Sequence, residues 1–252
     1  MTHDPKVTGL MRGFWDRKAR ENATYYISSY RDYGDQDPEE FWRWGRILTE
    51  RYLDESGIAF TGEETVLEVG CGIGRMTRAL AERFARVVGV DISEEMITRG
   101  RQELADLDNV TLAVGNGVDL GELEDRSIDF VFSYIVLQHI PDARVSLGYI
   151  REFGRVLRPG ARAYFQVNNL RSGLRGRLRL KSRLRAWIGG RGKEPENGEG
   201  AGPTGLDHPA WTGSRLTLPQ IRRACAEGDL EIVSLKGEGT QYLWVHARKR
   251  AD

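Results

Sequence analysis

The sequence predicts an α/β fold in which short strands of one sheet alternate with amphipathic helices. Three observations support this. Apolar, β-branched runs recur at 65–69, 85–91, 109–114 and 127–133. Helical apolar spacing follows the first run. Each run is followed by glycine or ends in a polar residue, and in open α/β sheets such strand ends form the ligand-binding edge. The 252 residues suit one such domain with additions.

Composition and charge exclude several classes of protein. Lys plus Arg and Asp plus Glu number 37 each, so no overall field favours nucleic acid or a membrane surface. Cys71 and Cys225 make no disulfide framework and suit a reducing cytosol. Residues 1–10 lack the apolar core of a signal peptide, and no run approaches the roughly 18–20 apolar residues of a membrane span. We expect a cytoplasmic monomer or homodimer.

The first strand runs into a glycine-rich turn, in which Gly70, Gly72 and Gly74 follow Glu68 at every second position. Glycine allows positive φ and lets a ligand lie against bare backbone, and the N-terminus of the next helix favours a carboxylate or phosphate. A dinucleotide-binding G-x-G-x-x-G would need glycine at position 75, which is Arg75. A turn with a purely structural role is the alternative interpretation.

An acid before evenly spaced glycines resembles motif I, E/D-x-G-x-G-x-G, of the class I S-adenosylmethionine-dependent methyltransferases. Glu68 and the three glycines match it without a gap, and Cys71 lies where this family often has cysteine. The resemblance covers 63–166. It implies a Rossmann-like seven-stranded sheet with helices on both faces and an antiparallel last strand between the fifth and sixth. The run 161–167, after a turn over residues 157–160, supplies the fifth strand, and the runs 230–235 and 242–248 supply the last two. Thr217 is the expected N-cap of the short helix before them.

An acid at the carboxyl end of the second strand completes the expected donor site. Asp91 lies 17 residues after Gly74, where its carboxylate can accept hydrogen bonds from both ribose hydroxyls of an adenosine. A helix cap is the alternative role. The resemblance implies that Ile92 and Met96 lie near the adenosine, and Ser93 is the expected N-cap of the following helix.

The ends of the third and fourth strands add further candidates. Asn116 follows the third strand, and the resemblance implies that its side chain bonds the adenine amino group while the N–H of Gly117 or Val118 serves a ring nitrogen. A plain Asn-Gly turn is the competing interpretation. Ser133 ends the fourth strand at the same edge of the sheet, so it joins the candidate donor-binding residues.

The stretch from Tyr134 to Pro141 resembles the family's post-strand signature, which closes in His-Ile-Pro. His139 is the candidate general base, because its ordinary pKa near 6.5 suits proton transfer. In other relatives this histidine only packs or orients, and that interpretation stays open. We expect no metal, because Ser133 and Tyr134 stand where metal-dependent relatives carry an acidic pair, and no His/Cys cluster has zinc spacing.

We expect four parts: a helical cap at 1–60, the donor-binding core at 61–168, a basic insertion at 169–210, and a closing helix with two strands at 211–252. The candidate acceptor-lining residues are aromatic: Trp15, Tyr25, Tyr26, Tyr134 and Trp211. Packing of the cap helices onto the sheet would explain the cap aromatics equally.

The insertion carries seven Arg or Lys residues between Arg171 and Arg185 without one acid. It suits a solvated helix, a lid over the acceptor, or a surface for nucleic acid, membrane or an acidic substrate.

The leading hypothesis is methyl transfer from S-adenosylmethionine, which leaves S-adenosylhomocysteine, to an oxygen or nitrogen of a small molecule. The closest resemblance is to bacterial enzymes of that kind, including those that tailor secondary metabolites. Two alternatives stay open: an RNA or protein methyltransferase that uses 171–185 as its grip, and a donor-binding partner protein without catalysis. A nicotinamide oxidoreductase is disfavoured by Glu68 and Arg75.

Overall fold

The computed structural model describes residues 5–28, 33, 37–170 and 204–251. The basic stretch at 171–185, with its three possible roles, lies outside the described residues.

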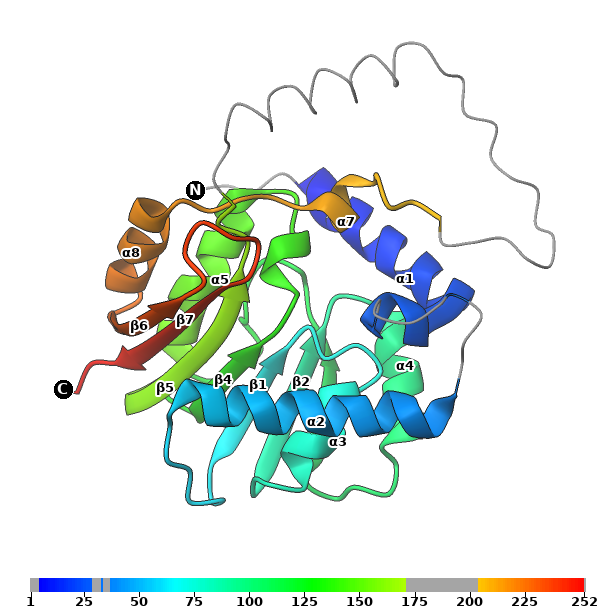
Figure 1. The fold of residues 1–252 in the computed structure, drawn as a ribbon, viewed down its shortest axis with the longest axis horizontal. Helices are drawn as coiled ribbons and strands as arrows, with labels where there is room; N and C mark the ends of the chain where they lie inside the picture. Colours follow the sequence, from blue (N-terminus) through cyan, green and yellow to red (C-terminus); the bar gives the residue numbers. More distant parts are fainter. Residues whose placement is uncertain (1–4, 29–32, 34–36, 171–203, 252) are drawn as a thin grey trace, which may run out of the picture.

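A seven-stranded sheet in the order β3-β2-β1-β4-β5-β7-β6 forms the centre of the structure (Figure 1). The strands are β1 (Thr65–Val69), β2 (Arg86–Asp91), β3 (Val110–Val114), β4 (Ile128–Ser133), β5 (Leu157–Val167), β6 (Leu230–Lys236) and β7 (Leu243–Lys249). Strands β1 to β5 pair in parallel, whereas β7 runs antiparallel to both β5 and β6. The predicted fold class, with its antiparallel last strand between the fifth and sixth, is confirmed.

Strand β5 begins earlier than the sequence predicts. Leu157 already pairs with Ile128, and the next pair joins Phe130 to Arg162, so the register shifts between these two pairs. Gly160 lies inside the extra stretch at φ +80°, a conformation that glycine adopts without steric cost. The turn expected over residues 157–160 is therefore an irregularity within the strand rather than a separate element.

Several helices begin at polar caps, two of which the sequence predicts correctly. Ser93 Oγ accepts the N–H of Met96, and Thr217 forms a capping box with Gln220. The helices are α1 (Pro5–Ser28), α2 (Pro38–Ser56), α3 (Arg75–Ala81), α4 (Glu94–Glu103), the 3₁₀ turn η1 (Leu137–His139), α5 (Ala143–Val156), α7 (Pro209–Thr212) and α8 (Leu218–Glu227).

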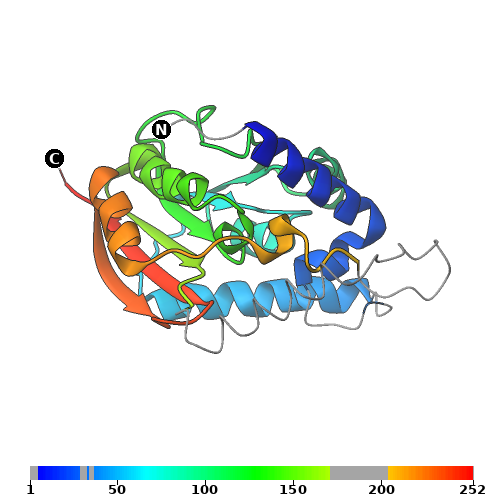
Figure 2. The same cartoon turned by 90° about the horizontal axis from the view of Figure 1, so that it is seen from above.

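Alternate side chains of the strands pack into two apolar layers. Figure 2 shows the sheet between α2 on one side and α5 and α8 on the other. Val66, Phe130 and Phe132 pack in the layer under α2 and α3. Leu67 and Val131 pack in the layer under α5 and α8. Because alternate side chains pack on opposite faces of the sheet, the helices cover its two faces. The carboxyl ends of β1, β2, β3 and β4 lie at its edge, where a site can form.

Helix α1 is fastened over these strand ends. Arg12 Nη2 donates to the Gly115 carbonyl oxygen at 3.2 Å, and Ser93 Oγ donates to Asp16 Oδ1 at 2.6 Å. The helix is interrupted at Asn22, which has extended backbone (φ −167°, ψ 83°). As a result, its first part lies against α4, and its last turn reaches the glycine-rich turn after β1.

Two glycines of α5 test how tightly the second layer is packed. A methyl group at Gly154 would meet the Gly228 carbonyl oxygen at 1.7 Å, whereas one at Gly148 would have only the Val118 carbonyl oxygen nearby, at 3.6 Å. We expect Gly154→Ala to lower the free energy of unfolding by about 1–3 kcal/mol. Gly148→Ala, the matched control, should raise it by about 0.5–1 kcal/mol in urea unfolding. Equal effects would contradict close packing at Gly154.

Candidate active site

The turn between β1 and α3 is built from bare main chain. The N–H of Gly70 donates to the Val90 carbonyl oxygen at 2.7 Å, which ties the turn to β2. Gly70 has φ +78°, and a methyl group there would meet Val136 Cγ2 at 2.1 Å. Gly72 has φ +55°, and a methyl group there would meet Ile27 Cδ1 at 2.8 Å. Both positions therefore require glycine, and the main chain itself forms the wall of the site.

Asp91 ends β2 beside this turn. Its Oδ2 accepts the N–H of Gly72 at 2.9 Å, and its Oδ1 accepts the N–H of Ser93 at 2.9 Å. Burial raises the pKa of the Asp91 carboxyl, and the backbone N–H groups of Ser93, Gly72 and Ile92 oppose that rise. The N-cap of α4 is Ser93 and not Asp91. A carboxylate has about four acceptor sites, so Asp91 keeps capacity for a further donor such as a ribose hydroxyl.

Glu68 and Cys71 are both buried beneath the turn. Burial raises the pKa of Glu68 to about 7, although Thr77 Oγ1 donates to its Oε2 at 2.6 Å and the nearby Arg75 charge lowers it. Burial also raises the pKa of the Cys71 thiol well above its usual value. The thiol therefore stays protonated and packs against the site as a small apolar group, without nucleophilic character.

One pocket joins the glycine turn to the segment after β4. Its empty volume, open mouth included, is about 1060 Å³. The sequence-predicted residues that line it are Trp15, Tyr26, Glu68, Gly70, Cys71, Gly72, Asp91, Ile92, Met96, Gly117, Tyr134 and His139. The structure thus brings candidate donor, acceptor and catalytic residues to one cavity.

Other predicted residues lie behind the pocket wall. Gly74 is the N-cap of α3, and Ser133 Oγ donates to the Val69 carbonyl oxygen at 3.1 Å. Tyr25 packs edge-on against the ring of Tyr26, and the ring of Trp211 lies 5.2 Å from that of His139. These residues do not line the pocket, so they can affect the site only by positioning the residues that do.

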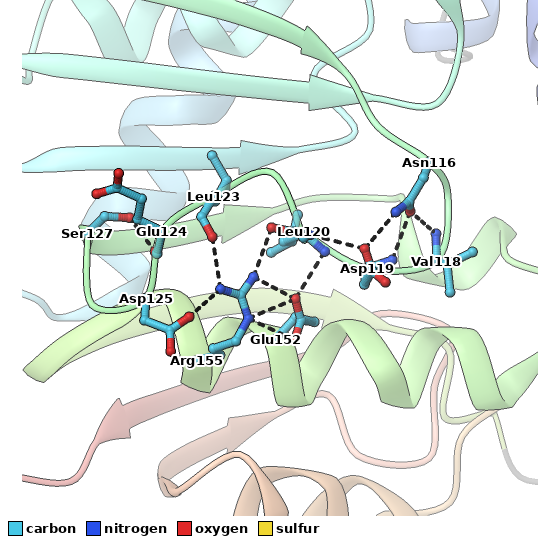
Figure 3. Close-up of polar contacts among 11 residues, drawn as sticks. Asn116, Val118, Asp119, Leu120, Leu123, Glu124, Asp125, Ser127, Glu152 and Arg155 are labelled. Carbon is cyan, nitrogen blue, oxygen red and sulfur yellow. Dashed lines mark hydrogen bonds and ion pairs between the residues drawn. The ribbon is translucent and has the colours of Figure 1, made fainter. Parts of the chain in front are cut away.

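The loop after β3 uses its own side chains to hold its shape (Figure 3). Asn116 Oδ1 accepts the N–H groups of Val118 and Asp119 at 2.7 and 3.0 Å, and its Nδ2 donates to Asp119 Oδ1 at 2.6 Å. Both lone pairs of the Asn116 oxygen are thereby engaged. The adenine contact expected of Asn116 stays a prediction, and it would require these loop bonds to rearrange. At this end of the pocket the wall is Gly117.

Arg155 on α5 fastens the same loop from below (Figure 3). Its Nη1 donates to the Leu123 carbonyl oxygen at 2.8 Å and to Asp125 Oδ1 at 2.6 Å, and its Nη2 donates to the Leu120 carbonyl oxygen at 2.8 Å. Glu152 pairs with Arg155 at 2.7 Å and accepts the N–H of Leu120 at 3.1 Å. Nothing in the sequence pattern marked Arg155 as more than an exposed helical residue.

His139 lies in η1 at the other end of the pocket. Its Nδ1 is 2.5 Å from the Trp211 carbonyl oxygen, which can only accept, so Nδ1 carries the proton and Nε2 carries a lone pair. Burial among neighbouring rings lowers the pKa of His139 to about 4, and the Trp211 hydrogen bond opposes that shift. At neutral pH the ring is therefore uncharged and able to accept a proton at Nε2.

Three glutamine groups support this orientation of His139. Gln166 Nε2 donates to Gln138 Oε1 at 2.8 Å and to the Gln241 carbonyl oxygen at 2.5 Å. Gln138 therefore turns its amide nitrogen toward His139 Nε2, 3.4 Å away. The network agrees with a proton on Nδ1 and an acceptor at Nε2.

Sequence reasoning missed part of the pocket wall. The added residues are Met11, Ile27, Val69, Arg75, Met76, Val90, Ile135, Val136, Ile140 and Tyr149. Tyr149 follows Val145 and precedes Phe153 at helical spacing, the signature of a core position. Met11 and Ile27 reach the pocket only because α1 folds over it, which no local signal announces.

No group of three or more His, Cys, Asp and Glu side chains within the described ranges is placed to hold a metal ion. In the same part of the chain, no helix has the length and apolar character needed to cross a membrane.

A family comparison identifies the central segment. Residues 67–165, which run from within β1 to within β5, match the family model for the methyltransferase domain. Residues 67–165 form a methyltransferase domain. The family resemblance inferred from Glu68 and its glycines is therefore confirmed, and the glycine turn, Asp91, the loop after β3 and His139 all belong to this methyltransferase domain.

A curated relative matches part of this chain. Demethylmenaquinone methyltransferase of Staphylococcus aureus is 38% identical over 97 residues, which are 37% of this chain and 39% of the relative. The chain thus aligns with well under half the length of that relative, and the alignment is about the size of the methyltransferase domain.

Solved structures extend the likeness of fold beyond that domain. Phosphoethanolamine N-methyltransferase 1 of Haemonchus contortus, in complex with phosphoethanolamine and S-adenosylhomocysteine, has a TM-score of 0.66 at 18% identity, over 100% of this chain and 50% of that one. Magnesium protoporphyrin IX methyltransferase of Synechocystis, with S-adenosylhomocysteine bound, has a TM-score of 0.61 at 17% identity, over 96% of this chain and 99% of that one. Both likenesses concern the fold, and the predicted enzyme class and cofactor agree with the methyltransferase family match.

The first prediction from this site concerns Arg155. In Arg155→Gln the loop after β3 loses its contacts from α5, so the Gly117 wall loosens. We expect the affinity for S-adenosylhomocysteine to fall about tenfold, roughly 1.4 kcal/mol, in titration calorimetry. Arg151→Gln is the matched control, because Arg151 lies on the same helix but pairs with Glu227. Equal affinities of the two variants would contradict a loop-holding role.

The second prediction concerns pH. The pKa of Glu68 is about 7 in the folded protein against 4.5 ordinarily, so between these values the folded state holds a proton that the unfolded chain has released. The stability contributed by Glu68 is full below pH 4.5 and is lost as pH rises to about 7. We expect the stability of Glu68→Gln relative to the parent protein to rise by about 1–3 kcal/mol across this window. Parallel pH profiles in urea unfolding would contradict a raised pKa.

Proposed function

We propose that this chain is an S-adenosylmethionine-dependent methyltransferase that methylates an oxygen or nitrogen of a small molecule. The main support for the proposal is that one pocket contains both a donor-binding end and an acceptor end. One end presents bare glycine backbone and the Asp91 carboxylate, and the other presents the lone pair of His139.

The residues present fit the donor. The glycine turn lines the pocket with main chain, because Val136 and Ile27 leave no room for a Cβ at Gly70 or Gly72. The Asp91 carboxylate retains acceptor capacity for a ribose hydroxyl. Ile92 and Met96 supply apolar wall, and Gly117 closes the end beside β3. With the nucleoside held over β2 and β3, the part of the pocket beside β4 remains for the acceptor.

When bound, the donor supplies a methyl group on a positively charged sulfur, which makes it electrophilic without further activation. The pocket walls hold the acceptor in line and exclude water, and orientation of this kind is worth up to about 7–11 kcal/mol of barrier. His139 Nε2 receives the proton of an acceptor hydroxyl, which replaces the 3.4 Å contact from Gln138 Nε2. Because Nδ1–H is held by the Trp211 carbonyl, the lone pair keeps a fixed direction.

Three comparisons support a small acceptor. The named activities of the relatives concern demethylmenaquinone, phosphoethanolamine and magnesium protoporphyrin IX, none of which is a macromolecule. The pocket is also covered by α1, through Met11, Trp15 and Tyr26. The hypothesis of an RNA or protein acceptor rested on the basic stretch 171–185, which lies outside the described residues.

The proposal is tested with methyl-labelled S-adenosylmethionine. We expect the folded protein to take up the donor in equilibrium dialysis, and label to move into the small-molecule fraction of a bacterial extract. Label that moves only into RNA or protein would overturn the acceptor class. Donor binding without transfer to any fraction would favour a non-catalytic partner protein, and absence of donor binding would remove the proposal altogether.

His139→Ala separates catalysis from binding. Removing the proton acceptor should lower turnover by about 10²- to 10⁴-fold, while the affinity for S-adenosylhomocysteine stays within about twofold, because the donor contacts lie at the other end of the pocket. The acid limb of the turnover profile in the parent enzyme should lie near pH 4, the lowered pKa of His139. Lost donor affinity with unchanged turnover of the bound enzyme would refute the base role.

A further inference from the structure

Four rings meet at the end of the pocket beside β4, and we name this group the aromatic corner: Trp15 and Tyr26 of α1, His139 of η1 and Trp211 of α7. Trp211 is central, with ring centroids 5.2 Å from His139, 6.1 Å from Trp15 and 5.8 Å from Tyr26. Trp15, Tyr26 and His139 line the pocket in front of it. The corner thus presents ring surfaces to whatever occupies this end.

The geometry of the aromatic corner suits a flat molecule. The rings of Trp15 and His139 are 5.6 Å apart at 77°, so one presents a face beside the edge of the other. An aromatic ligand gains most from stacking on a face while its edge meets a second ring. Both rings are held in advance, since Trp15 packs edge-on against Phe14 and His139 is bonded to the Trp211 carbonyl.

The charge of the aromatic corner argues against a cationic ligand. The Lys18 ammonium already lies 4.6 Å from the Tyr26 ring centroid, and Glu21 pairs with it at 2.5 Å. The carboxylates of Glu68 and Asp91 lie at the donor end, where hydrogen bonds engage them. A cationic acceptor would also meet the positive charge of the donor without a counter-ion.

An anionic ligand is disfavoured as well. Among the described residues that line the pocket, Arg75 is the one side chain with a permanent positive charge. It lies near Glu68 and over the ring of Phe41, and its Nη2 is 3.5 Å from the Ile27 carbonyl oxygen. The four side chains of the corner therefore offer an uncharged aromatic surface, in which His139 Nε2 is a hydrogen-bond acceptor and the Tyr26 hydroxyl is already engaged with Glu21 Oε1 at 2.6 Å.

We propose that the acceptor is an uncharged planar ring system with an acidic, phenol-type hydroxyl, which stacks in the aromatic corner and donates its hydroxyl to His139 Nε2. This rests on the proposed function and names the substrate class of the same site. The acceptor oxygen gains the methyl group as the methyl–sulfur bond breaks, and its proton passes to Nε2. The positive charge of the sulfonium is thereby replaced by that of imidazolium.

A phenol suits this site better than an alkanol for a chemical reason. A neutral imidazole that is reluctant to be protonated is a modest base, and phenolic hydroxyls, with a pKa of about 10, release their protons far more readily than aliphatic ones. The ring that makes the hydroxyl acidic is also the part that the aromatic corner would stack.

The test uses one ring skeleton in four forms, each titrated into the full-length protein saturated with S-adenosylhomocysteine. The probes are 2-naphthol, its saturated counterpart decahydro-2-naphthol, 2-naphthylmethylammonium and 2-naphthyl phosphate. We expect 2-naphthol to bind at least tenfold more tightly than each of the other three. Equal or tighter binding of the saturated, cationic or anionic probe would overturn the proposal, as would failure of 2-naphthol to bind.

A variant pair places the binding at the aromatic corner. Trp15→Leu should weaken 2-naphthol binding at least tenfold while leaving the affinity for S-adenosylhomocysteine within twofold. Trp44→Leu is the matched control, because Trp44 is a 42% exposed tryptophan of α2 outside the pocket. An unchanged affinity in Trp15→Leu would overturn the proposal, and the wild-type probe series decides it if that variant does not fold.

Failure of the wild-type protein to bind S-adenosylhomocysteine would instead contradict the proposed function. The two failures are thus distinguishable, because donor-product binding is measured separately from probe binding.

Discussion

The site depends on the close approach of the turn after β1 to the end of β2. The N–H groups of Gly70 and Cys71 share the Val90 carbonyl oxygen at 2.7 and 3.2 Å, and the N–H of Gly72 donates to Asp91. The segment after β4 and α1 pack against the same glycines, through Val136 and Ile27. A side chain at Gly70 would displace the segment after β4, and one at Gly72 would displace the end of α1. This one backbone stretch therefore aligns the donor end, the acceptor end and the covering helix.

The covering helix is coupled to the donor end through shared polar groups. Ser93 caps α4 with its oxygen while its hydroxyl donates to Asp16 of α1. The Asp16 charge also helps to raise the pKa of Asp91. Positions that hold α1 closed are therefore adjacent to those that would hold a ribose, and the electrostatic cost of two neighbouring carboxylates falls when hydrogen-bond donors reach Asp91.

Much of the fold follows from local pattern, because strand and helix periods differ and because caps such as Ser93 and Thr217 stand where helices begin. The glycine turn and Asp91 were predictable for the same reason. The early start of β5 was not, since a register shift depends on the neighbouring strand. Helical spacing marks Tyr149 as a core position and Arg155 as a surface position. It does not show that Tyr149 lines the pocket or that Arg155 holds the loop after β3, so both roles were missed.

The acceptor end could be predicted least, and the contacts of Trp211 show why. Its ring touches Trp15, Tyr26 and His139, which lie far from it in the sequence, so only the tertiary fold assembles them. Yet the atom that fixes the proton on His139 is the main-chain carbonyl of Trp211, which any residue at that position would supply. The side chain of Trp211 thus shapes the aromatic corner, whereas its main-chain carbonyl fixes which nitrogen of His139 accepts a proton. The corner's surface can therefore change by substitution while the lone pair at Nε2 keeps its direction.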